Sequence, residues 1–303
     1  MTGARTRLPA VTAVIPARSP DVALMVRAVE SALLCEPMER VIVVDSGSPE
    51  AIDRGALPGD ARVEVVRTER PGPSAARNVG LDLAATPWVL LLDHDDAAEV
   101  AGLEAGLRLG VELRAAAVVS ARVEERAGAD GVMVDRVRPV PGRLAGRTLA
   151  RADEVFEPIA LYGSTGVLVR QSVLLDGVRF DEDLWIGEDR DFLRRVGARG
   201  GIAVNPEVAV RRRLHDEGAA NLSGPRHMER RVRDHLVILE RWFSVESAGH
   251  FRDATMWLIN ACARTGVSDA AWRELVSAAR VHGWRVPMKA RWRRWRAGSV
   301  AEG

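Results

Sequence analysis

The sequence predicts an α/β protein with a mostly parallel central sheet flanked by helices, followed by an α-helical C-terminal extension. In the first third of the chain, short β-branched runs alternate with amphipathic segments, the pattern of buried parallel strands connected by helices. From Pro225 onward the apolar residues recur at helical spacing. We therefore expect two domains, residues 1–224 and residues 225–303.

Strands are expected where short, apolar and largely β-branched runs are bounded by turn residues. These runs are residues 11–15, 41–44, 63–66, 88–92, 118–123, 132–137, 162–169 and 203–212. We expect Pro16 to end the first run, because proline lacks a backbone donor. Residues 138–153 are rich in Pro, Gly and Arg and are expected to form a surface loop.

Helices are expected where apolar residues recur every three or four positions. These segments are residues 21–34, 74–84, 188–197, 226–243, 248–265 and 269–282. Ser19 or Asp21 is placed to cap the first of them. The order of strands and helices puts polar residues directly after strands, where open α/β sheets bind their ligands.

Composition excludes several classes of protein. A formal net charge of +1 argues against a dedicated nucleic-acid binder. Two cysteines, Cys35 and Cys262, are too few for a disulfide framework or a cysteine zinc site. The N-terminus lacks the apolar core of a signal peptide, and no window approaches the roughly 20 apolar residues that span a bilayer. We expect a cytoplasmic protein, soluble or peripheral at the inner face of the membrane.

The acidic motif Asp93-His94-Asp95-Asp96 directly follows an expected strand. Neighbouring carboxylates repel one another unless something neutralises them. Mg²⁺ and Mn²⁺ prefer oxygen ligands and often bind one or two carboxylates together with substrate phosphates. The motif therefore indicates a metal–diphosphate site, and the alternative is a solvated acidic turn in which Asp96 caps the next helix.

Three further clusters are weaker signals when each is taken alone. Glu188 and Asp189 stand where a helix is expected to begin, so they either cap it or supply a base for an attacking hydroxyl. The basic run from Arg211 to His215 is either a solvated face or a charge that stabilises a leaving diphosphate. Arg77, early in a helix after a Gly/Pro loop, suits a diphosphate neighbour.

In this order the motifs resemble glycosyltransferase family 2. The matching segments are Val11-Thr12-Ala13-Val14-Ile15-Pro16, Val41-Ile42-Val43-Val44-Asp45-Ser46, Ala76-Arg77-Asn78-Val79-Gly80, Leu91-Leu92-Asp93-His94-Asp95-Asp96, Phe180-Asp181-Glu182, Gly187-Glu188-Asp189 and the stretch from His215 to Ser223. The resemblance covers residues 10–223 and implies the GT-A fold, which is Rossmann-like. It also implies an inverting enzyme that moves a sugar from a nucleoside-diphosphate sugar, with UDP favoured, to an acceptor hydroxyl.

The resemblance also implies roles for single residues. The donor would be bound by Pro16, Ala17, Arg18, Asp45, Arg77, Asp93 and His94, with Asp45 near the base. Asp93, Asp95 and His215 would hold Mn²⁺ or Mg²⁺ against the diphosphate. Asp189 would be the catalytic base, supported by Glu188. The chain departs from the family pattern at Arg18-Ser19, where an aromatic-Asn pair is common, and at Val100, where a Pro is common.

Other functions remain open from the sequence. A sugar-nucleotide pyrophosphorylase opens with a Gly-rich loop carrying Arg and Lys, which the segment after residue 15 does not match. A catalytically silent nucleotide-sugar-binding or assembly subunit would keep the fold, although both Asp95 and Asp189 are present. The acceptor implied by the family is a saccharide or a lipid-linked sugar. The basic, aromatic tail at residues 289–296 lies at a membrane surface, attracts an anionic partner or is a solvated tail.

Overall fold

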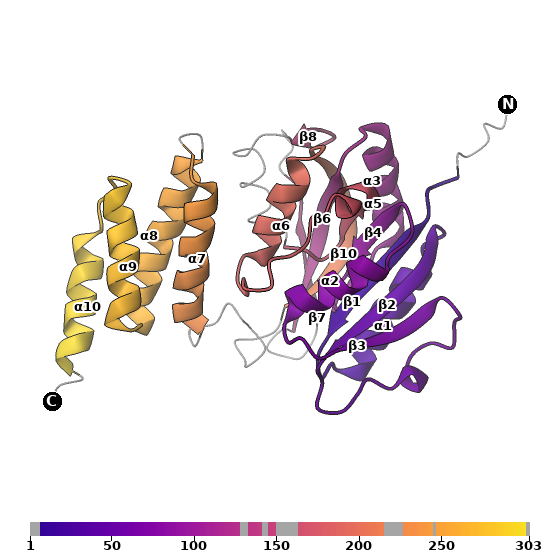
Figure 1. Ribbon diagram of the computed structural model, residues 1–303, viewed down its shortest axis with the longest axis horizontal. Helices are drawn as coiled ribbons and strands as arrows, with labels where there is room; N and C mark the ends of the chain where they lie inside the picture. Colours follow the sequence, from indigo (N-terminus) through magenta and orange to yellow (C-terminus); the bar gives the residue numbers. More distant parts are fainter. Residues whose placement is uncertain are drawn as a thin grey trace. The chain divides into compact units, whose positions relative to one another are not determined.

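The computed structural model describes residues 7–127, 133–140, 145–149, 163–214, 227–244 and 247–300 (Figure 1). Its internal contacts divide the chain into two compact units. The sheet unit comprises Met1–Asp183 and Glu188–Asp216, and the helical unit comprises Leu184–Gly187 and Glu217–Gly303. The domain boundary expected between residues 224 and 225 falls outside the described residues.

The elements of the sheet unit alternate between strands and helices along the chain. They are β1 (Val11–Ala17), α1 (Val22–Leu33), β2 (Met38–Ser46), the short 3-10 helix η1 (Arg54–Ala56), β3 (Val63–Thr68), α2 (Pro73–Leu83), β4 (Trp88–Leu91), β5 (Ala97–Ala98), α3 (Val100–Glu112), β6 (Ala117–Ala127), β7 (Met133–Arg138), β8 (Thr148–Leu149), β9 (Val167–Arg170), α5 (Gln171–Leu175), α6 (Glu188–Gly197) and β10 (Ile202–Leu214).

One mixed sheet runs through the unit in the order β3-β2-β1-β4-β9-β6-β10-β5, with β7 beside β6 and β8 beside β10. Strands β1 to β4 are all parallel. Strand β9 is antiparallel to both β4 and β6, so β6 and the parallel β10 run in the same direction as β1. The carboxyl ends of β1, β2, β4, β6 and β10 therefore share one edge of the sheet. That edge carries the site.

Helices cover both faces of the sheet, as the alternating sequence predicts. In β1, Ala13 and Ile15 pack into the core that includes α1 and α3. The intervening Val14 points to the opposite core, which includes α2, α5 and α6. Because successive side chains of a strand point to opposite faces, a strand buried on both sides must be apolar throughout. Asp21 caps α1 by accepting a hydrogen bond from the backbone N–H of Leu24.

Helix α2 lies very close to β1 because Gly80 faces the sheet. A Cβ atom placed on Gly80 would lie 2.3 Å from Cγ1 of Val14 and 3.1 Å from its Cβ. Valine is short and stiff at χ1, so it has little room to move away. The glycine of the Ala-Arg-Asn-x-Gly motif is thus required for the close packing of α2 on β1. This packing holds Arg77 and Asn78, which lie on the same helix, close to the sheet.

The structure corrects four expectations about local structure. Pro16 does not end β1 but lies inside it, and β4 pairs with β1 only as far as Val14, so no bond to that strand is lost. The strand expected over residues 162–169 begins only at Val167. Gly163 and Gly166 take φ values of +65° and +77°, which turn the chain instead.

The other two corrections concern the expected surface loop and the C-terminal tail. Within residues 138–153, Thr148–Leu149 form β8 and pair with β10, while 141–144 and 150–153 lie outside the described residues. The tail forms helix α10 (Met288–Val300), in which Ala290 is buried. Arg294 donates a 2.7 Å hydrogen bond to Asp269, whereas Trp292 is 53% exposed, so the helix packs on one side and is open to solvent on the other.

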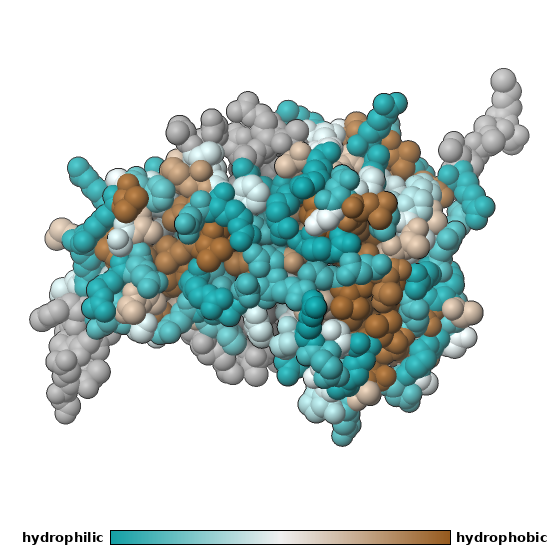
Figure 2. All heavy atoms as spheres, in the orientation of Figure 1, coloured by the Kyte–Doolittle hydropathy of each residue, from teal (hydrophilic) through white to brown (hydrophobic). Residues whose placement is uncertain are grey.

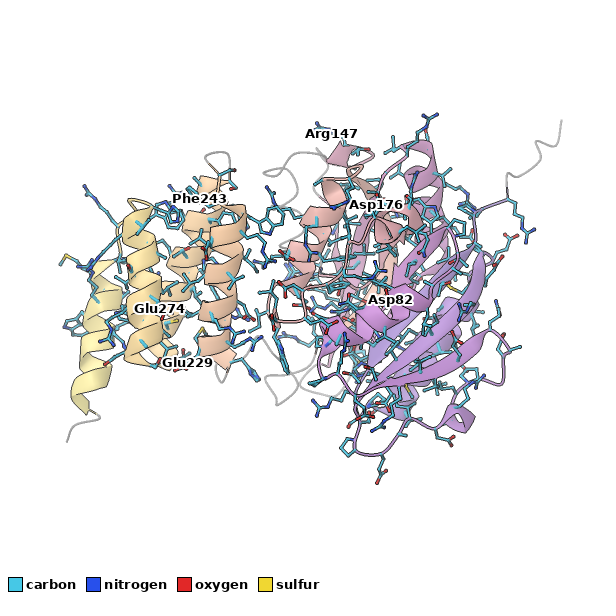
Figure 3. The ribbon with its side chains drawn as sticks, in the orientation of Figure 1. Asp82, Arg147, Asp176, Glu229, Phe243 and Glu274 are labelled. Atoms are coloured by element: carbon cyan, nitrogen blue, oxygen red, sulfur yellow. The ribbon has the colours of Figure 1, made fainter. Side chains whose placement is uncertain are left out.

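The helical unit consists of α10 together with α7 (Met228–Trp242), α8 (Ala248–Thr265) and α9 (Asp269–Val281). A core of its own includes Val232, Ile259 and Leu275. Glu229 of α7, labelled in Figure 3, accepts a 2.7 Å hydrogen bond from the backbone N–H of Ser268 before α9. Within the described residues, no helix has both the length and the apolarity to cross a membrane.

Candidate active site

Apart from Arg77 of α2, the donor residues implied by the resemblance lie at or directly after the carboxyl ends of neighbouring strands. Ala17 lies at the end of β1 and pairs in register with Asp45 of β2, and Pro16 pairs with Val44. Arg18 follows β1 and is exposed, whereas Ala17 is buried. Apolar residues therefore end β1, and the exposed Arg18 follows them directly.

Figure 2 shows one face of the surface, where hydrophilic side chains surround smaller apolar areas.

Asp45 is 1% exposed, and its carboxylate is held by its own loop. It accepts hydrogen bonds from the backbone N–H groups of Ser48 at 2.9 Å and Ile52 at 3.3 Å, and from Arg67 at 3.0 Å. Burial works to raise the pKa of Asp45, but the hydrogen bonds from Ser48 and Ile52 and the charge of Arg67 outweigh it and lower the pKa. The ionised Asp45 thus shapes the loop that follows β2.

The acidic motif after β4 divides into buried and accessible carboxylates. Asp96 is 2% exposed and accepts a 2.8 Å hydrogen bond from the backbone N–H of Arg213 in β10. Burial and the charges of Asp93 and Asp95 raise the pKa of Asp96 well above its ordinary value. The suggestion that Asp96 caps the next helix is wrong, since the N-cap of α3 is Glu99. Asp96 instead joins the motif to β10.

Asp93, His94 and Asp95 are each partly exposed at the strand end. The backbone N–H of Asp93 donates to the Thr165 hydroxyl at 3.2 Å. Burial works to raise the pKa of Asp93, but the charge and hydrogen bond of Arg77 lower it below the ordinary value. Asp93 is therefore ionised at neutral pH. It holds its negative charge at the edge where the strands end.

Arg77 of α2 joins the acidic motif to the motif that carries the expected base. Its buried guanidinium, 5% exposed, donates to Asp93 at 2.9 Å and to Glu188 at 3.2 Å. It also lies over the ring of Phe180, 5.3 Å from the ring centroid. Burial disfavours the charged guanidinium, but Asp93 and Glu188 outweigh that effect and raise the pKa of Arg77. Besides the expected place of Arg77 beside a diphosphate, the residue has a second role as the buried cation that pairs with Asp93 and Glu188.

Helix α2 also fixes the segment that leads toward the expected base. The Asn78 amide donates to the carbonyl of Phe180 at 3.0 Å and accepts from its N–H at 2.8 Å. Asp82, labelled in Figure 3, accepts a 2.7 Å hydrogen bond from Arg179. The Phe180 ring stacks on Phe192 of α6, with the ring centroids 3.9 Å apart. The Ala-Arg-Asn-x-Gly motif and the Phe-Asp-Glu motif, about a hundred residues apart, are thus joined by hydrogen bonds.

Glu188 and Asp189 open helix α6 and differ in environment. The Glu188 side chain is 13% exposed, and burial together with the charge of Asp189 raises the pKa of Glu188 to about 7. Asp189 is partly exposed, and its Oδ1 accepts a 2.7 Å hydrogen bond from the N–H of Arg190. A Cβ on Gly163 would lie 3.5 Å from Oδ2 of Asp189, so the backbone of the Gly163 turn borders this carboxylate.

The basic run before His215 serves three different purposes. Arg211 binds the buried Glu125 at 2.6 Å, with Glu99 and Asp135 beside it, and so supports the sheet. Arg213 holds Asp96 through its backbone. The charge of Arg212 acts on Asp93 and lowers its pKa. His215 itself lies outside the described residues.

The structure brings Arg77, Asp93 and Glu188 into direct contact, and Asp189 adjoins them through the chain. Asn78 and Thr165 support the site, although the sequence predicted no role for either. The position of Asn78 inside the Ala-Arg-Asn-x-Gly motif is a signal for it, whereas nothing in the pattern around Thr165 distinguishes it. Among the described residues, no three His, Cys, Asp or Glu side chains converge in a way that holds a metal ion by themselves.

Comparison with known proteins shows the family to which the chain belongs. The family model described as glycosyl transferase family 2 matches residues 12–176, more than half of the chain. The chain belongs to glycosyl transferase family 2. The matched region of this family 2 member covers β1 to α5 and includes Arg77 and the acidic motif.

Two relatives are succinoglycan biosynthesis proteins of Rhizobium meliloti (strain 1021). ExoU is 31% identical over 190 residues, which are 57% of this chain and 53% of ExoU. ExoO is 29% identical over 264 residues, which are 78% of this chain and 70% of ExoO. The match thus spans about half the length of ExoU.

Solved structures of S. aureus TarS 1–349 are similar in fold. The complex with UDP-GlcNAc has a TM-score of 0.61 at 17% identity, covering 93% of this chain and 82% of TarS 1–349. The complex with UDP has a TM-score of 0.54 at 17% identity, covering 90% and 87%. The expected α/β fold with helices flanking a mostly parallel sheet, of the GT-A type, is confirmed.

Proposed function

We propose that the chain transfers a sugar from a UDP-sugar to an acceptor hydroxyl with inversion at the anomeric carbon. The observation that carries the proposal is the chain of contacts from Asp93 through Arg77 to Glu188. It puts an ionised carboxylate at the strand ends beside the residue that precedes Asp189. Donor site and base thereby belong to one cluster.

Asp189 is the proposed base. Its carboxylate is partly exposed and borders the Gly163 turn, where the absence of a side chain leaves room beside it. The acceptor oxygen forms a bond to the anomeric carbon while the bond to the diphosphate oxygen breaks, and Asp189 takes the hydroxyl proton. A single displacement of this kind inverts the anomeric centre. Glu188 supports Asp189 by fixing the first turn of α6 to Arg77.

The donor is proposed to lie along the carboxyl ends of β1, β2 and β4. Ala17 and the loop shaped by Asp45 would border the nucleoside, and Arg18 and His94 would contact the donor. Arg212 supplies positive charge near Asp93, toward the diphosphate. The similar fold of TarS, solved with UDP and with UDP-GlcNAc, supports UDP as the nucleotide of the donor.

A divalent cation, Mn²⁺ or Mg²⁺, fits the acidic motif when it is completed by a diphosphate. Asp93 and Asp95 offer partly exposed carboxylate oxygens, the ligand type that hard cations prefer. One or two carboxylates with phosphate oxygens make an ordinary Mg²⁺ site, so a cluster of three protein ligands is not needed. A bound cation would offset negative charge on the leaving diphosphate. His215 would be a further ligand.

A thermal-shift experiment with UDP-, GDP- and dTDP-sugars, with and without Mn²⁺, tests the donor site. A ligand at a hundred times its dissociation constant stabilises the native state by about 2.7 kcal/mol, a shift of several degrees in Tm. We expect a Mn²⁺-dependent shift with UDP-sugars that Asp95→Ala abolishes. The exposed Asp253→Ala is the control, since it lies in α8 of the helical unit.

Release of UDP from the stabilising donor then separates an enzyme from a silent binding subunit. We expect turnover by the wild type and a kcat lower by about 10²–10⁴-fold for Asp189→Asn. A shift in Tm without any UDP release, with saccharide acceptors present, favours the silent nucleotide-sugar-binding or assembly subunit. No shift from folded protein across the whole panel removes the donor-site assignment.

A further inference from the structure

The four residues before Glu188, the neighbour of the proposed base, belong to the helical unit. Leu184–Gly187 cluster with the C-terminal helices, although the residues on both sides of them in sequence belong to the sheet unit. Glu188 and Asp189 follow directly. Three residues of chain span at most about 10 Å, so whatever holds Ile186 restricts where Asp189 can lie.

Asp234 of α7 holds this segment by its backbone. Its carboxylate is completely buried, and Oδ2 accepts hydrogen bonds from the N–H groups of Trp185 and Ile186, each at 3.0 Å. Two N–H groups on consecutive residues converge on one oxygen, which fixes the orientation of the peptide between them. A charged acceptor makes such bonds stronger than a neutral one does.

Arg230 secures the carboxylate from the preceding turn of α7. Its Nε lies 3.0 Å from Oδ1 and 3.1 Å from Oδ2 of Asp234. The same guanidinium lies over the Trp185 ring, 5.4 Å from its centroid. Arg230 therefore both neutralises the buried Asp234 and packs on the segment that Asp234 binds.

Ile238 completes the contact one turn later. A Cβ on Gly187 would lie 2.8 Å from Cδ1 of Ile238, and Gly187 has a φ of +86°. Residues 230, 234 and 238 are spaced by four and so lie on one face of α7. That face contacts the segment from Trp185 to Gly187, directly before the base.

We propose that Asp234 is a positioning residue for catalysis: through Trp185 and Ile186 it sets the start of α6, and thereby the place of Asp189. The inference rests on the proposed function, because it assumes that Asp189 is the base. It goes beyond that function by giving one side chain of α7 an effect on the reaction. Asp234 itself touches neither substrate nor base in this scheme.

The test compares Asp234→Ala and Asp234→Asn with Thr255→Val in the full chain. Thr255 is buried in α8 and bonds to His235 at 2.8 Å, so its loss weakens the same unit without touching the segment. Three quantities are measured: deuterium uptake of peptides covering residues 184–189, the affinity for UDP, and kcat for UDP release from the donor found by thermal shift.

We expect Asp234→Ala to raise deuterium uptake over residues 184–189 and to lower kcat about tenfold to a hundredfold, because small displacements of a catalytic group are costly. UDP affinity should stay within about twofold, since the donor site lies on the strand ends. Asp234→Asn keeps one carbonyl oxygen for the two N–H groups and should give an intermediate kcat. Thr255→Val should lower Tm with kcat unchanged.

Several results would overturn the proposal. One is unchanged uptake over residues 184–189 in Asp234→Ala, and another is a kcat that falls no more than in Thr255→Val. A loss of UDP affinity as large as the loss of kcat would point to a damaged donor site instead. If the wild type turns over no donor, the proposed function fails, and deuterium uptake alone then decides whether Asp234 holds the segment.

Discussion

Nη1 of Arg77 donates a 3.2 Å hydrogen bond to Oε1 of Glu188, a residue that lies more than a hundred positions later in the chain. The bond joins α2, which follows β3, to α6, which carries the proposed base. Both side chains are largely buried, so neither is paired by solvent when the other is removed. Replacing either partner therefore measures how much the pair contributes to the stability of the site.

Replacing Arg77 with Ala should lower the free energy of unfolding by about 3–5 kcal/mol, because it leaves the largely buried Glu188 and the partly exposed Asp93 without their cation. Arg77→Lys should be intermediate, since an ammonium is a compact charge that does not fork between Asp93 and Glu188. Urea unfolding measures both. Arg108→Ala, which breaks an exposed pair within α3, is the control and should cost only about 0.3–0.5 kcal/mol. Equal losses for Arg77 and Arg108 would contradict the assignment.

Stability should depend on pH through Glu188. Its pKa in the folded chain is about 7, raised from 4.5 by burial and by Asp189. The folded state therefore binds the proton more tightly, and this stabilisation is fully present below pH about 4.5 and is lost as the pH rises through about 7. Glu188→Gln removes the titration. Between pH 5 and 8 the wild type should lose on the order of 3 kcal/mol relative to this variant.

The comparison is made by urea unfolding of both proteins across that range. Because titrations elsewhere are common to both, the difference between wild type and Glu188→Gln isolates the one carboxyl. If the difference in the free energy of unfolding stays constant from pH 5 to 8, the pKa of Glu188 is not raised.

Asp189→Asn should reduce kcat by about 10²–10⁴-fold while UDP affinity is retained, as expected for loss of a general base. UDP release and isothermal titration with UDP measure the two quantities. Asp183→Asn is the matched control, because it makes the same substitution at an exposed residue shortly before α6. Substantial activity in Asp189→Asn would transfer the role of base to another residue.

Gly80→Ala should destabilise the chain by about 1–3 kcal/mol, because the new Cβ would overlap Val14 and push α2 away from β1. Since α2 carries Arg77 and Asn78, activity should fall as well. Gly59→Ala is the control: no atom lies within 4 Å of a Cβ at that position, and the change should be nearly neutral. Thermal melts of the two variants decide the matter.

The order of strands and helices was predictable because burial on both faces leaves a plain signal. The apolar run of β1 and the capped α1 follow directly from it. Strands of two residues, such as β5 and β8, are too short to carry a pattern and exist because β10 pairs with them. The strand predicted over residues 162–169 begins too early, because the positive φ angles of Gly163 and Gly166 cannot be seen in the sequence.

The site was predictable as a set of motifs but not as a set of contacts. The acidic motif shows three carboxylates in sequence, yet only the fold separates the buried Asp96 from the accessible Asp95. Arg77 was expected near phosphate, and its two carboxylate partners come from elements far apart in sequence. Asp234 gave no signal at all, because an acidic residue in a helix is ordinarily a solvated one.

The discontinuous helical unit has a consequence for exchanging parts between relatives. A chimera joined after residue 216 would bring a foreign α7 to the native Leu184–Gly187 segment and separate two partners that the chain keeps together. A graft that carries residues 184–187 along with the helices would preserve them as a pair. Diversification of the C-terminal helices is therefore constrained by four residues that lie some forty positions upstream of α7.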